Sequence, residues 1–337
     1  TVMRTKILYV LVSDEYDIYL EQTFLSIYSL RLYMPDVHVT LLIDDSTSET
    51  MVGGRESILE YVTENIIINL NHNFNKMQRS RYLKTMARNY VNGDFLYIDS
   101  DTIITSSLLR IDELECLMGA VEDTHTPIKK HILRKTIRRL CRNTNFSMNS
   151  IDTYFNSGVL YVKDCAETRD FFKSWNKNWI EGGKKGIFID QISLAKTNYE
   201  FGNFIYELSA IWNCQITFGV RYVQEARIIH YLCTNIVNAN DEIAYFFQNK
   251  NIFYNLKNDY LISECLHNQI RNARNSFGER TKIVSGSDLD LMSSYFYLLL
   301  RQIYCYHHIL FNLNESLLIF LLHIYHQINN LFIRKIK

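Results

Sequence analysis

The chain contains little proline or glycine and no closely spaced cysteine pair. Only two prolines and twelve glycines occur among its 337 residues, which excludes a collagen-like or proline-rich protein and argues against extended disorder. Its seven cysteines, an odd number without any C-x-x-C spacing, fit neither a disulfide framework nor a zinc knuckle. The sequence therefore predicts a folded protein of a reducing, cytoplasmic compartment.

Neither sign of charge is in excess. Thirty-six basic residues balance thirty-six acidic ones, unlike a protein whose main task is to neutralise a nucleic-acid backbone. We therefore expect no nucleic-acid partner and only local phosphate chemistry.

The first apolar run is short. Residues 7–12 are followed at once by Ser13-Asp14-Glu15, so the run is too short for the hydrophobic region of a signal peptide and is predicted to be a buried strand. With 47% hydrophobic residues, a chain of this length can bury one large domain and still carry an extension.

Short β-branched or aromatic runs alternate with segments of helical period. This pattern is typical of a mostly parallel sheet covered by helices, so the predicted fold class is α/β, doubly wound in its first half. The predicted strands are 6–12, 38–43, 65–70, 95–98, 117–121 and 159–163. Because ligands bind at the carboxyl ends of such strands, the polar residues to inspect are Ser13-Asp14, Asp44-Asp45 and Asp99-Ser100-Asp101.

The glycine-rich loops that usually bind phosphates are absent. Neither G-x-G-x-x-G after the first strand nor G-x-x-x-x-G-K-[ST] anywhere is found, so a phosphate ligand would need a cation instead. Asp99 and Asp101 follow the apolar run 95–98, and two carboxylates at a strand end can bind one hard metal ion that bridges phosphate oxygens. The alternative is a pair of solvated turn or cap residues.

Three later segments also place polar groups beside apolar runs. Asn156-Ser157-Gly158 precedes the predicted strand 159–163, where a small residue lets a ligand approach the backbone or simply forms a turn. Asp190-Gln191 follows an apolar run and can bind a ligand or cap the next helix. His230 ends another apolar run and is either a metal ligand or a hydrogen-bonded structural residue.

Taken in order, these segments resemble glycosyltransferase family 8, a family of retaining transferases with nucleotide-sugar donors. The resemblance covers about residues 5–235 and implies the GT-A fold, a Rossmann-like mixed sheet flanked by helices. The segments that carry it are Ser13-Asp14-Glu15-Tyr16, Arg79-Ser80-Arg81-Tyr82-Leu83-Lys84, Leu96-Tyr97-Ile98-Asp99-Ser100-Asp101, Phe155-Asn156-Ser157-Gly158-Val159, Asp190-Gln191 and His230.

The resemblance implies a role for each matched residue. It implies Asp99, Asp101 and His230 as ligands of Mn²⁺ or Mg²⁺, and Gln191 and Asp190 as catalytic residues beside the anomeric carbon and the sugar hydroxyls. It further implies that Tyr16 stacks on uracil and that the remaining donor contacts come from Ser13, Asp14, Arg81, Lys84, Ser100, Asn156 and Ser157.

The implied reaction moves a hexose from a UDP-sugar, preferably UDP-glucose or UDP-galactose, to a glycan or glycolipid. The resemblance implies retention, with the acceptor hydroxyl attacking the face that UDP leaves and a phosphate oxygen taking its proton. Bacterial surface-glycan assembly, including lipopolysaccharide biosynthesis, is the implied setting.

The chain departs from the family pattern in two places. Its first loop reads Ser-Asp-Glu-Tyr where many members have Asp-Asp/Glu-Asn-Tyr. After His230 it lacks the Gly-x-x-Lys-Pro-Trp stretch, so the lysine that usually contacts the diphosphate has no counterpart in this position.

Two other functions fit parts of the sequence. An apolar strand that ends in Asp-x-Asp also opens the haloacid-dehalogenase-like phosphohydrolases, in which Asp99 would attack phosphate. A non-catalytic nucleotide-sugar-binding protein is the third hypothesis, although it leaves Gln191 and the three metal ligands unexplained.

Residues 129–142 are predicted to form a basic amphipathic helix. Seven lysines and arginines lie in this stretch, with apolar side chains at helical spacing. The helix face is either simply solvated or guides an anionic acceptor, such as a phosphorylated glycolipid.

The composition changes after Ser285-Gly286-Ser287. We predict a catalytic domain over 1–240, a helical connection over 241–285 and an apolar helical tail over 286–337. Residues 316–333 are uncharged but polar in their second half, so a spanning helix, which needs about 20 mostly apolar residues, is not expected. The tail is predicted either to form a protein or oligomer contact, or to lie on the cytoplasmic membrane surface with Arg334, Lys335 and Lys337 near anionic headgroups.

Overall fold

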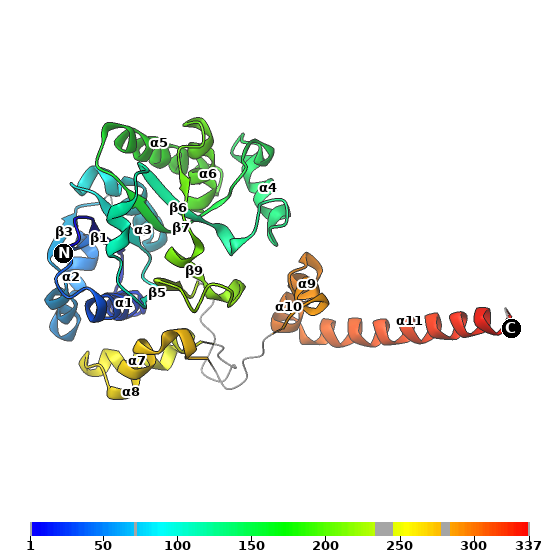
Figure 1. Ribbon diagram of the computed structural model, residues 1–337. Helices are drawn as coiled ribbons and strands as arrows, with labels where there is room; N and C mark the ends of the chain where they lie inside the picture. The colour runs from blue at the N-terminus through cyan, green and yellow to red at the C-terminus, as the bar shows by residue number, and fades with distance from the viewer. Residues whose placement is uncertain (1, 71–72, 233–244, 278–283, 336–337) are drawn as a thin grey trace. The chain divides into compact units, whose positions relative to one another are not determined.

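The computed structural model describes residues 2–70, 73–232, 245–277 and 284–335, and the side chains up to residue 328. The chain forms two compact units, Thr1–Thr281 and Lys282–Lys337. Each unit is described by itself (Figure 1).

A seven-stranded mixed sheet forms the centre of the first unit, which confirms the predicted α/β class. The strand order is β3-β2-β1-β4-β7-β6-β8, with the first four strands parallel and β7 antiparallel to both of its neighbours. The strands are β1 Lys6–Leu11, β2 Val39–Asp44, β3 Glu64–Ile68, β4 Phe95–Ile98, β6 Met118–Glu122, β7 Phe155–Val162 and β8 Tyr206–Glu207.

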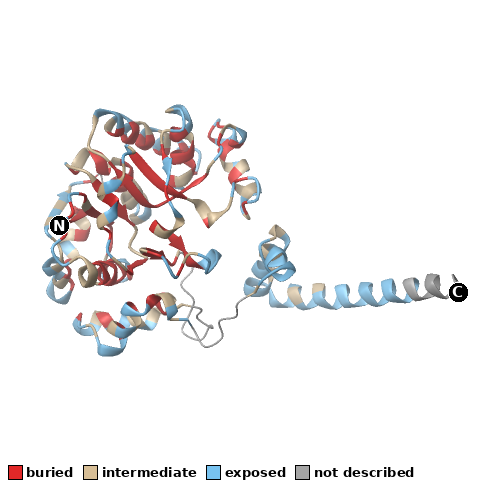
Figure 2. Ribbon diagram, in the orientation of Figure 1, coloured by how far each residue is buried: buried red, intermediate tan, exposed pale blue. Residues whose placement is uncertain are grey.

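Helices cover both faces of this sheet because its central strands are apolar on both sides. Along β1, Ile7, Tyr9 and Leu11 pack into one core, whereas Leu8 and Val10 pack into the other, as the two-residue period of a strand dictates. Figure 2 shows the resulting buried layer. The first core contains side chains of α1 (Tyr19–Tyr33), and the second contains side chains of α3 (Lys76–Tyr90), α5 (Ala166–Gly183) and α6 (Asp190–Glu200).

Strand β7 begins four residues earlier than the predicted strand 159–163. Asn156, Ser157 and Gly158 therefore lie within the strand and are not a turn before it. On the β6 side the register jumps from Ala120↔Leu160 to Val121↔Asn156, so residues 157–159 bulge away from β6 while they stay beside β4. A bulge of this kind re-aims side chains at the edge of a site.

A second, three-stranded sheet brings distant segments to the end of β4. Its order is β5-β10-β9, and His230 on β10 pairs with Thr102 on β5. The Tyr231 amide also donates to the Asp101 carbonyl at 3.0 Å. This pairing places His230 next to Asp101, 129 residues away in the sequence. The strands are β5 Thr102–Ile104, β9 Cys214–Gln215 and β10 Ile228–His230.

The predicted basic helix is shorter than expected. It spans α4, Arg134–Asn143, and does not begin at Lys129. The reason is His131, whose buried ring accepts the Leu133 amide at Nδ1 and contacts Asp123 at Nε2, 2.9 Å away, which holds the preceding residues in turns.

The helices of residues 245–277 pack against the first core. These residues belong to the first unit, and Phe253, Leu256, Leu266 and Ile270 are buried in the same core as the first strand. The remaining described elements of the first unit are α2 Asp45–Thr50, η1 Gly53–Tyr61, η2 Leu109–Glu113, η3 Asp123–His125, η4 Met148–Ser150, η5 Ala210–Trp212, η6 Ile216–Phe218, η8 Phe246–Gln248, α7 Lys250–Asp259, α8 Glu264–Arg271 and η9 Ala273–Asn275.

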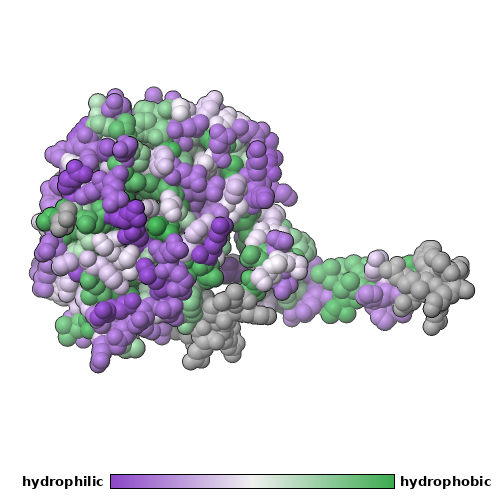
Figure 3. Space-filling model, viewed as in Figure 1, coloured by the Kyte–Doolittle hydropathy of each residue, from purple (hydrophilic) through white to green (hydrophobic). Residues whose placement is uncertain are grey.

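The second unit is helical, with α9 Ser287–Met292, α10 Tyr295–Tyr306 and α11 His308–Lys335. Hydrophobic side chains lie on the surface of α11 (Figure 3). Among the described residues, one helical stretch, His308–Ile328, is long and apolar enough to cross a membrane by length and composition, with a mean hydropathy of 1.3. One such stretch is weak evidence for spanning. It begins at His308, earlier than the stretch 316–333 weighed from the sequence.

Candidate active site

Asp99, Asp101 and His230 meet at the end of β4. Their potential ligand atoms all lie within 4.8 Å of one another, and His230 Nε2 is 3.0 Å from Asp101 Oδ1. One ion with bonds of about 2.1 Å spans about 4.2 Å between opposite ligands, so small side-chain movements bring these atoms to one ion. Carboxylate and imidazole ligands without a thiolate suit a divalent cation. The three residues therefore fit a divalent metal site.

The two oxygens of Asp99 have different surroundings. Oδ1 accepts from the Tyr97 hydroxyl and lies 3.3 Å from Lys84 Nζ. Burial and the Asp99 carboxylate raise the pKa of Tyr97, so its hydroxyl keeps the proton that it donates. Oδ2 faces Gly158, where an added Cβ would lie 2.8 Å away. Oδ2 is therefore the oxygen left for a metal ion.

His230 is buried beside carboxylates. Burial lowers its pKa, but the charges and hydrogen bond of Asp101, together with the charge of Asp99, outweigh that effect and raise the pKa above its ordinary value. The imidazole is thus held by the same two carboxylates that would share a metal ion with it.

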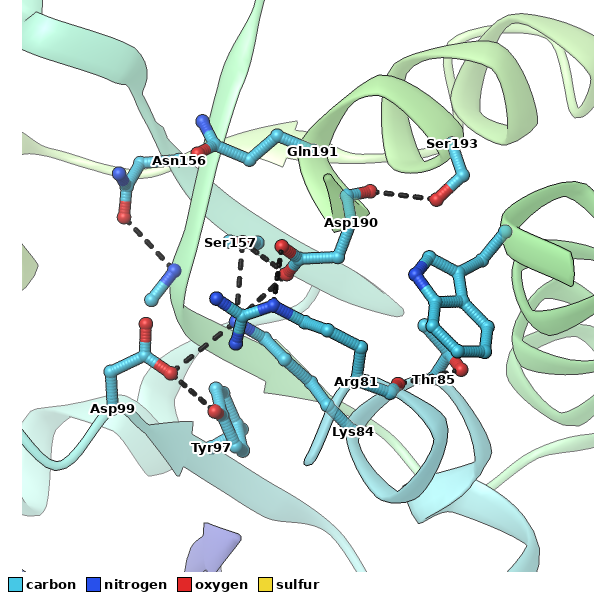
Figure 4. A network of polar contacts seen from close by, with 12 residues as sticks. Arg81, Lys84, Thr85, Tyr97, Asp99, Asn156, Ser157, Asp190, Gln191 and Ser193 are labelled. Carbon is cyan, nitrogen blue, oxygen red and sulfur yellow. Dashed lines mark hydrogen bonds and ion pairs between the residues drawn. The ribbon is translucent and has the colours of Figure 1, made fainter. Parts of the chain in front are cut away.

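A cluster of opposite charges lies beside the three candidate ligands, with Lys84 and Asp190 buried and Arg81 half-buried (Figure 4). Lys84 Nζ lies 3.0 Å from Asp190 Oδ2, and Arg81 Nε lies 3.1 Å from Asp190 Oδ1. The Ser157 hydroxyl donates to Asp190 at 2.7 Å. Burial alone would raise the pKa of Asp190, but the two cations and the hydroxyl hold it far below its ordinary value. Asp190 is therefore a fixed anion and a very weak base.

The first turn of α6 presents Asp190 and Gln191 to the site. Asp190 does not act as the helix cap, because the cap position is Ile189 and the carboxylate is bound to Lys84 and Arg81. The Trp175 indole donates to the Asp190 carbonyl at 3.1 Å and holds this turn. Gln191 Nε2 donates to the Phe155 carbonyl at 3.2 Å. The end of the Gln191 side chain lies toward Asn156 (Figure 4).

The loop after β1 contains the other candidate donor contacts. Ser13 donates to Asp17 at 2.6 Å, and Asp14 forms an ion pair with Lys76 at 2.5 Å. Burial opposes ionisation of Asp14, but Lys76 and two backbone amides together outweigh it and hold the pKa of Asp14 below the usual value. The Tyr16 ring is 82% exposed, so its face is free to stack on a planar ligand.

Ser100 lies between the two candidate carboxylate ligands and contacts α1. Its hydroxyl accepts from Thr23 at 2.7 Å. Asp44, also singled out from the sequence, caps α2 and pairs with Arg79 at 3.0 Å. The next residue, Asp45, accepts a hydrogen bond from the Leu70 amide. Asp44 and Asp45 thus have structural partners of their own.

Several residues around the site have no recognisable local signal in the sequence. Asn213 contacts His230, Asp123 contacts Asn156, and Lys257 of α7 donates to the Glu15 carbonyl at 2.8 Å. None of the three lies in a motif, and each reaches the site through tertiary packing. The segment after His230 that would carry the diphosphate-contacting lysine continues into residues 233–244, which lie outside the described residues.

The family assignment rests on a sequence profile described as "Glycosyl transferase family 8", which matches residues 10–236, about two thirds of the chain. The chain belongs to glycosyl transferase family 8. It is therefore a hexosyltransferase-like enzyme, and the phosphohydrolase and non-catalytic hypotheses are not supported. A search of curated proteins finds no match.

One solved structure shares the fold at a TM-score of 0.50, and two others are similar at lower TM-scores, all at low sequence identity. An active-site mutant of LgtC is 15% identical with a TM-score of 0.50, covering 78% of this chain and 99% of LgtC. Mouse xyloside xylosyltransferase 1 is 12% identical with a TM-score of 0.47, covering 68% and 98%. GlyE of Streptococcus pneumoniae TIGR4 is 17% identical with a TM-score of 0.46, covering 83% and 67%. The first unit of this family 8 enzyme has the GT-A fold.

Proposed function

We propose that this enzyme transfers glucose or galactose from a UDP-sugar to a hydroxyl of a glycan or glycolipid with retention of anomeric configuration. The observation that carries the proposal is the meeting of Asp99, Asp101 and His230 beside the Asp190–Lys84–Arg81 cluster. The first group suits a diphosphate-bound cation, and the second provides charged groups for a polar, uncharged sugar.

The roles proposed for the donor-binding residues are those that the resemblance to the family implies. Tyr16 stacks on uracil, with Ser13 and Asp14 beside the base and ribose, and Ser100 lies between the metal ligands. Asn156, Ser157, Arg81 and Lys84 surround the sugar and its phosphate, where Asp190 orients sugar hydroxyls and Gln191 lies by the anomeric carbon.

Asp99, Asp101 and His230 would hold Mn²⁺ or Mg²⁺. When bound, such an ion supplies Lewis-acid neutralisation of the charge that grows on departing UDP. Lys84 and Arg81 add positive charge close to the candidate metal ligands. Asp190 already holds both side chains, so they need no reorganisation during the reaction.

The low pKa of Asp190 supports a retaining mechanism that uses no protein base or nucleophile. A carboxylate whose pKa lies far below its usual value takes a proton poorly. Its oxygens are also bound to Lys84, Arg81 and Ser157. Proton transfer from the acceptor hydroxyl to a phosphate oxygen of the leaving group is therefore the proposed route.

A panel of nucleotide sugars with Mn²⁺ tests the function. We expect UDP release to be fastest with UDP-glucose or UDP-galactose, to stop after chelation of the metal, and to give an α-linked product by NMR. A β-linked product, or turnover that persists in a chelator, would contradict the proposal. Selectivity between the two hexoses depends on contacts to one hydroxyl.

We propose that the basic surface around α4 attracts an anionic acceptor. Residues 124–151 contain no Asp or Glu, and the His131 ring pairs with Asp123, which precedes this stretch. Asp123 also accepts from Asn156 at 2.9 Å, so the surface is attached directly to the proposed sugar site. Its cationic residues are Lys129, Lys130, Arg134, Lys135, Arg138, Arg139 and Arg142.

Neutralising four exposed residues of this surface is expected to raise the acceptor KM by about 10-fold, since loss of four exposed charge contacts of a few tenths of a kcal/mol each adds to about 1.4 kcal/mol. Hydrolysis of the donor without acceptor should not change. The residues to change to Gln are Lys129, Lys130, Arg139 and Arg142.

A control with the same change of net charge uses exposed lysines at α5 and the turn after it. This control should leave the acceptor KM as it is, and an equal rise in both variants would show a general charge effect. The control residues are Lys173, Lys177, Lys184 and Lys185.

We propose that the second unit attaches the enzyme to the cytoplasmic membrane face. Large apolar side chains of α10 and α11 are exposed within the described residues, such as Phe296, Ile309 and Phe320. The basic residues Arg334, Lys335 and Lys337 follow in the sequence, where they suit anionic headgroups. An oligomer contact through the same helices is the competing proposal.

The full chain is expected to co-sediment with anionic liposomes and to be released by high salt. A version that ends at Ser285 should stay in the supernatant. Equal binding by both versions would eliminate the tail as the anchor, and binding that resists both salt and alkaline carbonate would indicate a spanning helix. Dimers of the full chain without liposome binding would favour the oligomer contact.

A further inference from the structure

Two buried asparagines connect His230 to the backbone of β7. Asn213 Oδ1 lies 3.0 Å from His230 Nδ1, and Asn213 Nδ2 lies 2.9 Å from Asn156 Oδ1. Asn213 is fully buried and Asn156 nearly so. Either amide could be turned by 180° without changing its shape, so the directions of these hydrogen bonds have to come from groups whose role is fixed.

Asn156 has such a group on each side. The Gly158 amide, which can only donate, lies 2.9 Å from one amide atom of Asn156, and that atom must be the oxygen. The Asp123 carboxylate, which accepts when ionised, lies 2.9 Å from the other atom, and that atom must be the nitrogen. Both neighbours require the same orientation of Asn156.

The orientation of Asn156 then determines that of Asn213. Because Asn156 presents its oxygen, Asn213 must donate through Nδ2. Its own oxygen is left to face His230, so His230 Nδ1 must carry a proton. Without a metal ion, Nε2 also carries a proton, which the Asp101 carboxylate accepts at 3.0 Å. A metal ion that replaces this proton meets the lone pair of Nε2, while Nδ1 keeps its hydrogen bond to Asn213.

We infer that Asn213 is a positioning residue that fixes the tautomer of His230, so that Nε2 is the nitrogen presented to the metal ion. The inference rests on the metal site of the proposed function. Metal-ligating histidines commonly donate through the other ring nitrogen, and loss of that partner weakens metal binding about 10- to 100-fold. Asn213 immediately precedes β9, which pairs with β10, so the strand pairing that places His230 also places Asn213.

The first test is Asn213→Leu, which keeps the branching and the number of side-chain heavy atoms but removes both hydrogen bonds. We expect Mn²⁺ binding to the full chain, measured by EPR titration, to weaken about 10- to 100-fold. The matched control is Asn198→Leu, because Asn198 is a buried asparagine of α6 that accepts from the Ile205 amide away from the site. The control should lose stability without losing Mn²⁺ affinity.

The second readout is the proton on Nδ1 of His230, by ¹⁵N NMR of the histidine-labelled protein without metal. In the unaltered chain the Nδ1–H should exchange slowly with water because Asn213 accepts it, and in Asn213→Leu it should exchange faster. Asn213→Asp retains the acceptor opposite Nδ1 and should keep the Nδ1–H form even though it loses the bond to Asn156.

A His230 Nδ1 that carries no proton in the unaltered chain, or unchanged Mn²⁺ affinity in Asn213→Leu, would overturn the inference. The Nδ1 proton is measured without metal, so it decides the role of Asn213 even if the unaltered chain failed to bind Mn²⁺. That failure would instead count against the proposed function.

Discussion

Asp101→Asn is expected to lower sugar transfer by about 10³-fold or more while the protein keeps its fold. The substitution removes a charged ligand from the Asp99–Asp101–His230 group, and loss of Lewis-acid stabilisation of several kcal/mol corresponds to about three orders of magnitude in rate. The fold should persist because the Asp101 side chain is 19% exposed and an asparagine still hydrogen-bonds to His230. UDP-sugar turnover and thermal unfolding with and without Mn²⁺ measure the two effects.

Asp94→Asn is the matched control for this prediction. Asp94 precedes the same strand, β4, at its opposite end and accepts from the Asp164 amide at 2.8 Å, a bond that an asparagine oxygen can also accept. This variant should transfer sugar at nearly the normal rate and keep the stabilisation by Mn²⁺. Full turnover by Asp101→Asn with unchanged metal dependence would remove Asp101 from the metal site.

Gly158→Ala is expected to abolish metal binding and, with it, most of the transfer activity. A Cβ at this position would lie 2.3 Å from His230 Cε1, 2.8 Å from Asp99 Oδ2 and 2.9 Å from Asn156 Oδ1. Real Cβ atoms do not come this close to other atoms, so at least one of the two metal ligands must move. The expected measurement is a loss of Mn²⁺ affinity by EPR of more than about 100-fold, since a ligand itself is displaced and loss of one ligand's partner alone costs about 10- to 100-fold.

The control separates crowding of the site from crowding of the core. Gly119→Ala on β6 would place a Cβ 2.8 Å from the apolar end of Leu208, and such overpacking costs about 1–3 kcal/mol of stability. Both variants should unfold at lower temperature, but only Gly158→Ala should lose Mn²⁺. Retention of metal affinity in Gly158→Ala would show that Asp99 and His230 do not share an ion.

The sequence predicted the apolar middle of a strand more accurately than the residues at which the strand begins or ends. The predicted strands at 6–12 and 95–98 agree with β1 and β4 to within one residue, because each is a continuous apolar run buried on both faces. The strand at 159–163 was wrong by four residues at its start. Asn156-Ser157-Gly158 has turn composition, yet β4 pairing and the bulge against β6 extend the strand through it.

The length of α4 shows the same limitation. Residues 129–142 have helical spacing throughout, but the helix begins only at Arg134. The competing interaction comes from Asp123, which binds the His131 ring from outside the segment. A hydrogen bond to a residue outside the periodic stretch thus overrode a local pattern.

The sequence by itself determined the α/β class, the buried strands and the candidate metal ligands Asp99 and Asp101, because periodicity and an Asp-x-Asp at a strand end are local properties. Only the tertiary structure decided which atoms meet. His230 reaches Asp101 through the β5–β10 pairing, and Lys84 is buried between Asp99 and Asp190. These contacts depend on strand register and on buried hydrogen bonds between segments far apart in the chain, and no spacing along the sequence encodes them.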